Sequence, residues 1–505
     1  MASRQLSILP TGPLTGQGSH SVLIGLILAF TCLFVLMFAA AGMVAILTAM
    51  VAAGLIAWAT WRWPIWAAAA LAILAPINRF LLLLIFNVAD STLLLSALRL
   101  WDDALITVLL ARVIYDAFSR RKAPHLMYID VLMVFFIGLT ALYVFYPGTL
   151  AGNSMLNRFM GFRFDAFFLL AYFVGRGLQL KRHHVRWLMI ALIPSAVAVA
   201  IFGVWQWLQP GQSVAFFDFL RFEEFTRAVG GTGEVSLVRT RELAGTELSR
   251  VSSLVTGDLP LSYYQTFMIP FAAALFFAAK KPIHQAGAAL FLAAMLGVVV
   301  LTVTRSAIVA SIVALLLVTV LGRGVGKMML ISGALTALGL VFLLFSGLTP
   351  ASFGGLVSPE EGSLQVHVSA METSLELVEE EPLGRGLATA GPLTQRQALQ
   401  GGFTNESWYL QLATEIGIVG AVIFSVILLA TTVAAFISYG QVKDPWLRAL
   451  TIGLAGASVG FIIVGIVLHV WEFTSLSMLF WLLAGIAVRA PTLEAEWEAA
   501  EGAQP

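Results

Sequence analysis

Residues 402–420 read GFTNESWYLQLATEIGIVG and contain the transition that decides the fold. A polar segment ends at Ser407, two aromatic residues follow, and an apolar run then continues to about residue 438. Tryptophan and tyrosine are typical of a membrane–water interface, and an apolar run of this length can cross a bilayer as a helix. The stretch therefore predicts the start of a transmembrane helix, with Glu406 at its mouth and Glu415 inside it.

The composition extends this interpretation to the whole chain. Of 505 residues, 59% are hydrophobic and only 11% are charged, and the mean hydropathy is +0.91. A soluble domain has about 25% charged residues. The apolar runs have helical length and end at charged turns, which predicts an all-α polytopic membrane protein. The net charge of +1 argues against nucleic acid as a partner, and the single cysteine, Cys32, excludes an intrachain disulfide and a thiolate metal cluster.

We count about fourteen candidate spans and expect 12–14 transmembrane helices. The third is interrupted by Pro76 and Arg79, and the fourth contains Arg112. The spans lie at 22–39, 41–59, 65–86, 103–118, 128–146, 164–178, 187–208, 261–279, 285–303, 306–321, 328–347, 408–438, 449–468 and 471–488.

The lysines indicate the orientation of the chain. If the N-terminus is cytoplasmic, every lysine falls in a cytoplasmic loop, as the positive-inside rule expects; they are Lys122, Lys181, Lys280, Lys281, Lys327 and Lys443. The predicted organisation is a cytoplasmic segment at 1–21, a transmembrane domain at 22–488 and a cytoplasmic tail at 489–505. We expect the acidic tail to be disordered.

Two long segments, 208–260 and 348–407, contain no lysine and are predicted to lie outside. The first contains FFDFLRFEEF (216–225), which favours an amphipathic surface helix. The second contains SLQVHVSAMETSLELVEEE (363–381), whose apolar residues recur at spacings of three and four. That periodicity predicts a helix lying over the membrane domain.

Three arginines are expected at the outer ends of spans: Arg163, Arg250 and Arg305. A charge in or near a bilayer indicates function by default. Arginine keeps its charge when desolvated and offers a planar fork of donors, which suits a phosphate or pyrophosphate. The alternative is that each one snorkels to the interface or pairs with a carboxylate such as Asp165 or Asp258.

Glu406 is the candidate general base, because a carboxylate near apolar surface can have a raised pKa and still reach a polar substrate. The alternative is a helix cap, with Thr404 or Asn405 as N-cap and Glu406 in the first turn. The nine-residue spacing places Glu415 on the opposite helix face and about 13 Å deeper. We therefore interpret Glu415 as structural.

Small residues flank Glu415 in the span. Ala413, Gly417 and Ala421 form a stripe against which another helix is expected to pack. His367 in the second outer segment and His469 at the last outer turn are further polar candidates, although a lone histidine is usually a surface residue. No spacing typical of a metal site is present in the sequence.

Six segments in order carry a resemblance to a known family. They are GFRFDAFFLLAYFVG (161–175), AIFGVWQWLQPG (200–211), RVSSLVTGDLPLSYYQTFMIP (250–270), LTVTRSAIVASIVALLL (301–317), SLELVEEEPLGRGLATAG (374–391) and YLQLATEIGIVG (409–420). The last is similar to the signature YLxLLxExGxxG. Together they resemble the O-antigen ligase/polymerase family of bacterial envelope glycosyltransferases, from about residue 161 to residue 430.

The chain departs from this family at two positions. Family ligases have a His-Asn pair before the YL signature, where this chain has Glu406 and Ser407. Many members have an arginine early in the second outer segment, where this chain has His367. Because the ligase histidine is the family's acceptor-activating base, the substitution favours a polymerase. Glutamate can accept the same proton.

The resemblance implies a metal-independent, inverting glycosyltransferase of the bacterial inner membrane that needs no cofactor. Its donor would be an undecaprenyl-pyrophosphate-linked glycan and its acceptor a glycan or lipid, with the active site facing the periplasm among membrane lipids. Arg163, Arg305, Arg250 and Arg385 would bind the pyrophosphate, and Glu406, or else His367, would be catalytic. A flippase and a chain-length regulator are the expected protein partners.

Three alternatives to the polymerase interpretation stay open. A ligase would move the glycan to lipid A core, to a protein or to another lipid. A lipid-linked oligosaccharide transporter should have internal repeats and charges at the midplane, whereas these arginines gather at one face. The last alternative is a structural membrane scaffold.

Overall fold

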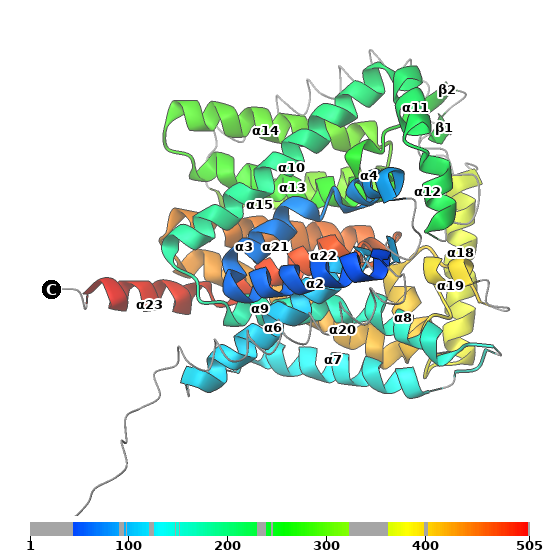
Figure 1. The fold of residues 1–505 in the computed structure, drawn as a ribbon, viewed down its shortest axis with the longest axis horizontal. Coiled ribbons are helices and arrows are strands. Elements are labelled where there is room, and N and C mark those ends of the chain that lie inside the picture. The colour runs from blue at the N-terminus through cyan, green and yellow to red at the C-terminus, as the bar shows by residue number, and fades with distance from the viewer. Residues whose placement is uncertain are drawn as a thin grey trace, which may run out of the picture.

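The computed structural model describes residues 44–89, 95–96, 98–120, 126–146, 148–150, 152–229, 239–243, 246–322, 362–397 and 402–502. The predicted spans at 22–39 and 328–347, and the segment 1–21, lie outside these residues. The described chain is a bundle of helices with one small hairpin (Figure 1).

The first half of the bundle runs as far as the hairpin. Its helices are α2 (Val44–Arg62), α3 (Pro64–Leu74), α4 (Asn78–Ala89), α6 (Trp101–Arg120), α7 (Tyr128–Phe145), α8 (Met155–Asp165), η1 (Phe167–Leu169), α9 (Leu170–Gly177), α10 (Arg182–Leu208), α11 (Pro210–Phe219) and α12 (Phe222–Ala228). Strands β1 (Arg239–Leu243) and β2 (Thr246–Arg250) pair antiparallel, with Arg239 opposite Arg250.

The second half holds the remaining helices. They are η2 (Ser253–Val255), α13 (Asp258–Ala278), α14 (Pro282–Leu301), α15 (Arg305–Leu321), α18 (Gly362–Glu380), α19 (Pro392–Gln397), α20 (Trp408–Gln441), α21 (Pro445–Gly465), η3 (Val470–Glu472), α22 (Thr474–Val488) and α23 (Ala490–Gly502).

Six described helices are long and apolar enough to cross a membrane: α7, α10, α13, α14, α20 and α21. Counting each of two bent pairs as one span raises the number to eight. This confirms the prediction of an all-α polytopic membrane protein. The predicted span 65–86 is one of the bent pairs, because α3 and α4 meet at 86° around the break that contains Pro76.

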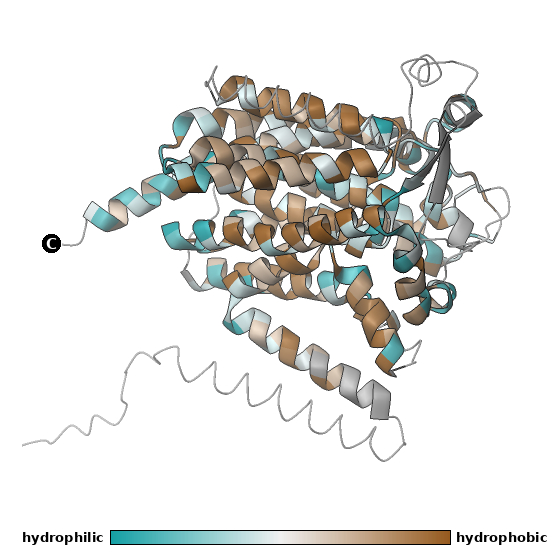
Figure 2. Cartoon of the chain, turned by 90° about the horizontal axis from the view of Figure 1, so that it is seen from above, coloured by the Kyte–Doolittle hydropathy of each residue, from teal (hydrophilic) through white to brown (hydrophobic). Residues whose placement is uncertain are grey.

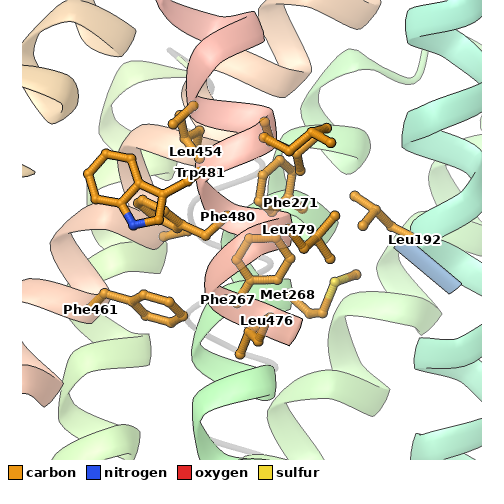
Figure 3. Packing of buried hydrophobic residues seen from close by; sticks show 14 of the residues in the cluster. Leu192, Phe267, Met268, Phe271, Leu454, Phe461, Leu476, Leu479, Phe480 and Trp481 are labelled. Carbon is orange, nitrogen blue, oxygen red and sulfur yellow. The ribbon is translucent and has the colours of Figure 1, made fainter. Parts of the chain in front are cut away.

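The core centres on α13, α21 and α22 (Figure 3). Phe461 of α21 stacks on Phe480 of α22, with ring centroids 5.3 Å apart, and Phe267 of α13 lies 6.2 Å from Phe461. Glycines bring α9 and α22 together, because a Cβ at Gly175 would lie only 2.0 Å from the Leu482 carbonyl oxygen. Close packing of this kind is a main source of helix association in lipid.

The two ends of the bundle differ in character. In Figure 1, α11, α12, the hairpin, α18 and α19 lie at one end, and α18 runs across it. At the opposite end lie α23 and the lysine-bearing turn between α13 and α14. Figure 2 shows hydrophobic residues along the helices and hydrophilic ones at helix ends and along the helix nearest the C-terminus. The described parts of the two long segments, 208–260 and 348–407, therefore share one end of the bundle.

Two local predictions are wrong. The tail is helical and docked, because Trp497 Nε1 donates to the Leu180 carbonyl oxygen at 2.7 Å and Glu494 accepts from the Lys443 N–H at 2.9 Å. The segment 216–225 is two helices, because Arg221 between α11 and α12 takes a left-handed conformation with φ of 53°. Its guanidinium Nε donates to Glu224 at 2.8 Å, which stabilises the turn.

Candidate functional site

The two candidate catalytic residues lie together. His367 is on α18, Glu406 precedes α20, and His367 Nδ1 lies 3.6 Å from Glu406 Oε2. Their side chains are 31% and 33% exposed, so a substrate can reach both. Partial burial raises the pKa of the Glu406 carboxyl above its usual range, and the His367 imidazole opposes this shift. A carboxylate in such a setting can accept a proton from a hydroxyl group.

Glu406 itself does not cap α20. The N-cap is Ser407, whose Oγ accepts from the Leu410 N–H at 3.4 Å and also lies 3.4 Å from the Gly465 carbonyl oxygen. The expectation that Thr404 or Asn405 caps this helix is therefore wrong. Glu406 lies one residue outside the helix, which leaves its carboxylate available for another role.

The residue before Glu406 is anchored as firmly as the residue after it. The Asn405 amide is fully buried and lies 2.9 Å from His469 Nε2. With its nitrogen facing His469, the amide also donates to the Ser407 carbonyl oxygen at 3.1 Å, and its oxygen accepts from the Gln411 N–H at 2.8 Å. Burial lowers the pKa of His469 to about 4, so its imidazole is neutral near pH 7 and can accept this bond. Glu406 is thus held between two buried, hydrogen-bonded neighbours.

Glu415 binds the glycine-rich loop that follows α18, residues 381–391. Its Oε2 accepts from the Ala388 N–H and its Oε1 accepts from the Ala390 N–H, both at 2.9 Å. The side chain is 1% exposed. These contacts agree with the structural interpretation of Glu415 and place its carboxylate on backbone groups.

Gly417 breaks α20 and gives the loop a second set of acceptors. Its φ of 78° lies in the left-handed region, which favours glycine. At this break the Thr414 carbonyl oxygen accepts from the Arg385 N–H at 2.7 Å, and the Glu415 carbonyl oxygen accepts from the Gly386 N–H at 3.0 Å. The prediction that Gly417 packs against another helix is wrong, because a Cβ there would lie 2.8 Å from the Pro382 carbonyl oxygen.

More buried polar groups adjoin Glu415. Asp165 interacts with Glu415, and Asp165 Oδ1 lies 3.5 Å from Gln411 Nε2. The same Gln411 nitrogen donates to Glu472 Oε1 at 3.3 Å. Across the described ranges, no group of three or more histidine, cysteine, aspartate and glutamate side chains could hold a metal ion.

Arg250 braces the turn that carries Arg305. Its guanidinium pairs with Asp258 at 2.7 Å, donates to the Thr302 carbonyl oxygen at 2.9 Å and donates to Thr304 Oγ1 at 2.8 Å. The alternative of pairing with Asp258 is therefore confirmed for Arg250. Arg305 follows Thr304 directly and is the first residue of α15, so Arg250 fixes the point from which Arg305 projects.

The other two arginines have carboxylate partners too. Arg163 donates through Nε to Asp103 Oδ2 at 2.8 Å, and its Nη2 lies 3.9 Å from Asp102 Oδ1. Its partners thus come from α6, and Asp165 is not one of them. Arg385 Nε lies 3.2 Å from Glu381 Oε1. Tyr263 of α13 lies within electrostatic range of both Arg250 and Glu406.

Sequence reasoning missed the role of Gln206. Its Oε1 accepts from the Ser252 N–H at 3.1 Å and from the Ser253 N–H at 2.7 Å, which ties α10 to the segment after Arg250. The signal was present, since an amide in a long apolar run needs hydrogen-bond partners. Sequence alone could not say that the partners lie more than forty residues ahead.

A family model described as O-antigen ligase matches residues 290–425. This match supports an assignment to the O-antigen ligase/polymerase family. The matched range includes Arg305, His367, Arg385, Glu406 and Glu415, whereas Arg163 and Arg250 precede it. No curated protein matches the sequence. The apolar helices are those of a multi-pass membrane protein, and the match indicates an O-antigen-ligase-type, glycosyl-transferring function.

Proposed function

We propose that this chain is an inner-membrane glycosyltransferase that polymerises a glycan carried on undecaprenyl pyrophosphate, with Glu406 as general base at the periplasmic face. The observation that carries the proposal is the position of Glu406. It is partly exposed, lies beside His367 and is held between anchored neighbours at the end of the bundle that α18 crosses. The lysine-bearing turn between α13 and α14 lies at the other end, which supports a periplasmic site.

The proposed reaction transfers one glycan from its lipid carrier to an acceptor hydroxyl. Glu406 takes the hydroxyl proton while the acceptor oxygen forms a bond to the anomeric carbon of the donor. The bond from that carbon to the pyrophosphate oxygen breaks, and undecaprenyl pyrophosphate leaves with the electron pair. Attack opposite the leaving group inverts the anomeric centre. His367 lies close enough to influence the charge on Glu406 throughout.

Positive charge is needed where the pyrophosphate leaves. We assign this role first to Arg305, since Arg250 braces its turn through three contacts. Arg250 and Arg385 supply further positive charge from positions fixed by Asp258 and Glu381. We assign Arg163 a smaller contribution to this charge, because both acids at the start of α6 face its guanidinium.

The test is the rate of glycan transfer by Glu406→Gln and Arg305→Ala. The donor is the lipid-linked glycan extracted from a strain that lacks this chain. We expect Glu406→Gln to lose turnover and still bind undecaprenyl pyrophosphate, and Arg305→Ala to lose that binding. Glu376→Gln removes the same charge from an exposed position on α18 and is the matched control. Normal turnover by Glu406→Gln would show that the base lies elsewhere.

A ligase is the second candidate, because the matching family model is described as O-antigen ligase. The two activities differ in what happens when the donor is the only glycan present. A polymerase converts it to longer lipid-linked chains. A ligase leaves it unchanged until a separate acceptor lipid or protein is added, and a transporter breaks no glycosidic bond with either mixture.

A further inference from the structure

The glycine-rich loop joins Glu415 to the segment that carries Glu406. The Gly391 N–H donates to the Phe403 carbonyl oxygen at 3.1 Å, and the Phe403 N–H donates to the Thr389 carbonyl oxygen at 3.3 Å. These bonds form a parallel bridge between Ala390 and Phe403. Because the Ala390 N–H also binds the Glu415 carboxylate, a short path of hydrogen bonds runs from Glu415 to a residue three positions before Glu406.

The side chain and the backbone of this helix turn hold different parts of the loop. Within the loop, the Glu415 carboxylate binds the N–H groups of Ala388 and Ala390, which adjoin the bridge to Phe403. The carbonyl groups exposed by the break at Gly417 bind Arg385 and Gly386. The two sets of bonds can therefore be perturbed separately, one toward Glu406 and the other toward Arg385.

The path leaves little room for adjustment. Ala388 and Ala390 are fully buried, and so is Asn405 on the far side of the bridge. Gly161 of α8 packs against the loop, since a Cβ there would lie 2.8 Å from the Ala388 nitrogen. A loop packed on both sides transmits a displacement at one end to the other.

We infer that Glu415 is a positioning residue that sets the place of Glu406 by binding the backbone of the glycine-rich loop. This inference rests on the proposed function, in which Glu406 is the base. Glu415 does not touch the substrate and acts through Ala390 and Phe403. Replacing it with glutamine keeps one acceptor oxygen and turns an amide NH₂ toward the second backbone N–H, so one of the two bonds is lost.

The test compares Glu415→Gln with Glu406→Gln and with the double variant, using the lipid-linked glycan extracted from the deletion strain. Displacing a catalytic group by about 1 Å can cost about 100-fold in rate, so we expect kcat of Glu415→Gln to fall by about that factor. Binding of undecaprenyl pyrophosphate should change little, because the bonds to Arg385 remain. In the Glu406→Gln background, the same change should lower the residual single-turnover rate no further.

Two further variants keep the test decisive. Thr432→Val removes a buried hydroxyl from the same helix, away from the loop, and should behave as wild type. Gly391→Ala strains the bridge from its other side, because Gly391 has φ of 73° and its Cβ would lie 2.4 Å from Gln411 Oε1. If Glu415→Gln does not insert in the membrane, Gly391→Ala should show the same loss of kcat and the same lack of additivity.

The outcomes separate this inference from the proposed function. If Glu406→Gln turns over normally, both are wrong. If Glu406→Gln is inactive and Glu415→Gln is normal, only the inference is wrong. If Glu415→Gln lowers the rate by the same factor with and without Glu406, it acts independently of the base, which also overturns the inference.

Discussion

Replacing His469 with glutamine should make the stability of this protein less dependent on pH. The imidazole is 8% exposed and lies 2.9 Å from the Asn405 amide. A proton on Nε2 would put two donors face to face in a buried site. Glutamine can accept the bond from Asn405 and carries no charge at any pH between 4 and 7.

The size of the effect follows from the pKa of His469. Burial lowers it from 6.5 to about 4. Between these values the unfolded chain binds a proton at this residue and the folded chain does not, so stability falls as the pH drops from 6.5 toward 4. A difference of 2.5 units at 1.36 kcal/mol each amounts to about 3 kcal/mol below pH 4.

The assay is the free energy of unfolding in detergent micelles at several pH values from 7 to 4, for the wild type and His469→Gln. Every other titrating group is common to both chains, so the difference between the two curves isolates His469. We expect the wild type to lose about 3 kcal/mol more than the variant over this range. Parallel curves would refute the argument, because they would mean that His469 takes up a proton in the folded state.

Two other predictions concern the same end of the bundle. Gly417→Ala should lower the free energy of unfolding by about 1–2 kcal/mol from the left-handed backbone alone. The new Cβ would add to this cost, because it would lie 2.8 Å from the Pro382 carbonyl oxygen. The control is Gly287→Ala on α14, where a Cβ meets nothing within 4 Å and the same measurement should show no loss. His367→Gln should move the acid limb of the kcat/KM profile to higher pH, because the imidazole lowers the pKa of Glu406 and only the ionised carboxylate is a base. An unchanged limb, or one displaced to lower pH, would contradict this coupling.

Much of the membrane fold could be predicted from the sequence, because the length and polarity of each span are properties of its own residues. The predicted spans 128–146 and 187–208 correspond to α7 and α10, with ends that differ by a few residues. The prediction of a disordered tail is wrong because it rested on the acidic composition alone. Trp497 and Glu494 bind backbone groups from other parts of the chain. Such bonds leave no local pattern, since every residue except proline offers the same N–H and C=O groups.

The candidate site, like the fold, could be predicted from local sequence only in part. Glu406 could be predicted from its place at the mouth of a span, and its closeness to His367 required a contact between segments about forty residues apart. The partners of Arg163 could not be predicted, because Asp102 and Asp103 begin a helix sixty residues earlier and look like ordinary first-turn acids. A charged residue in an apolar segment indicates that a partner is needed. Which residue is the partner depends on how the chain folds.

The two acids of residues 402–420 show why a signature can contain a residue that never meets substrate. A helix that breaks at Gly417 exposes two carbonyl groups, and a carboxylate two residues earlier accepts two N–H groups, so the turn offers acceptors to a loop with four donors. The loop needs left-handed backbone at Gly384 and Gly386 to aim those donors. The glutamate, the glycine after it and the glycine-rich loop thus form one hydrogen-bonded unit. A change in any one of them should affect Glu406 or Arg385, although Glu415 and Gly417 themselves are buried.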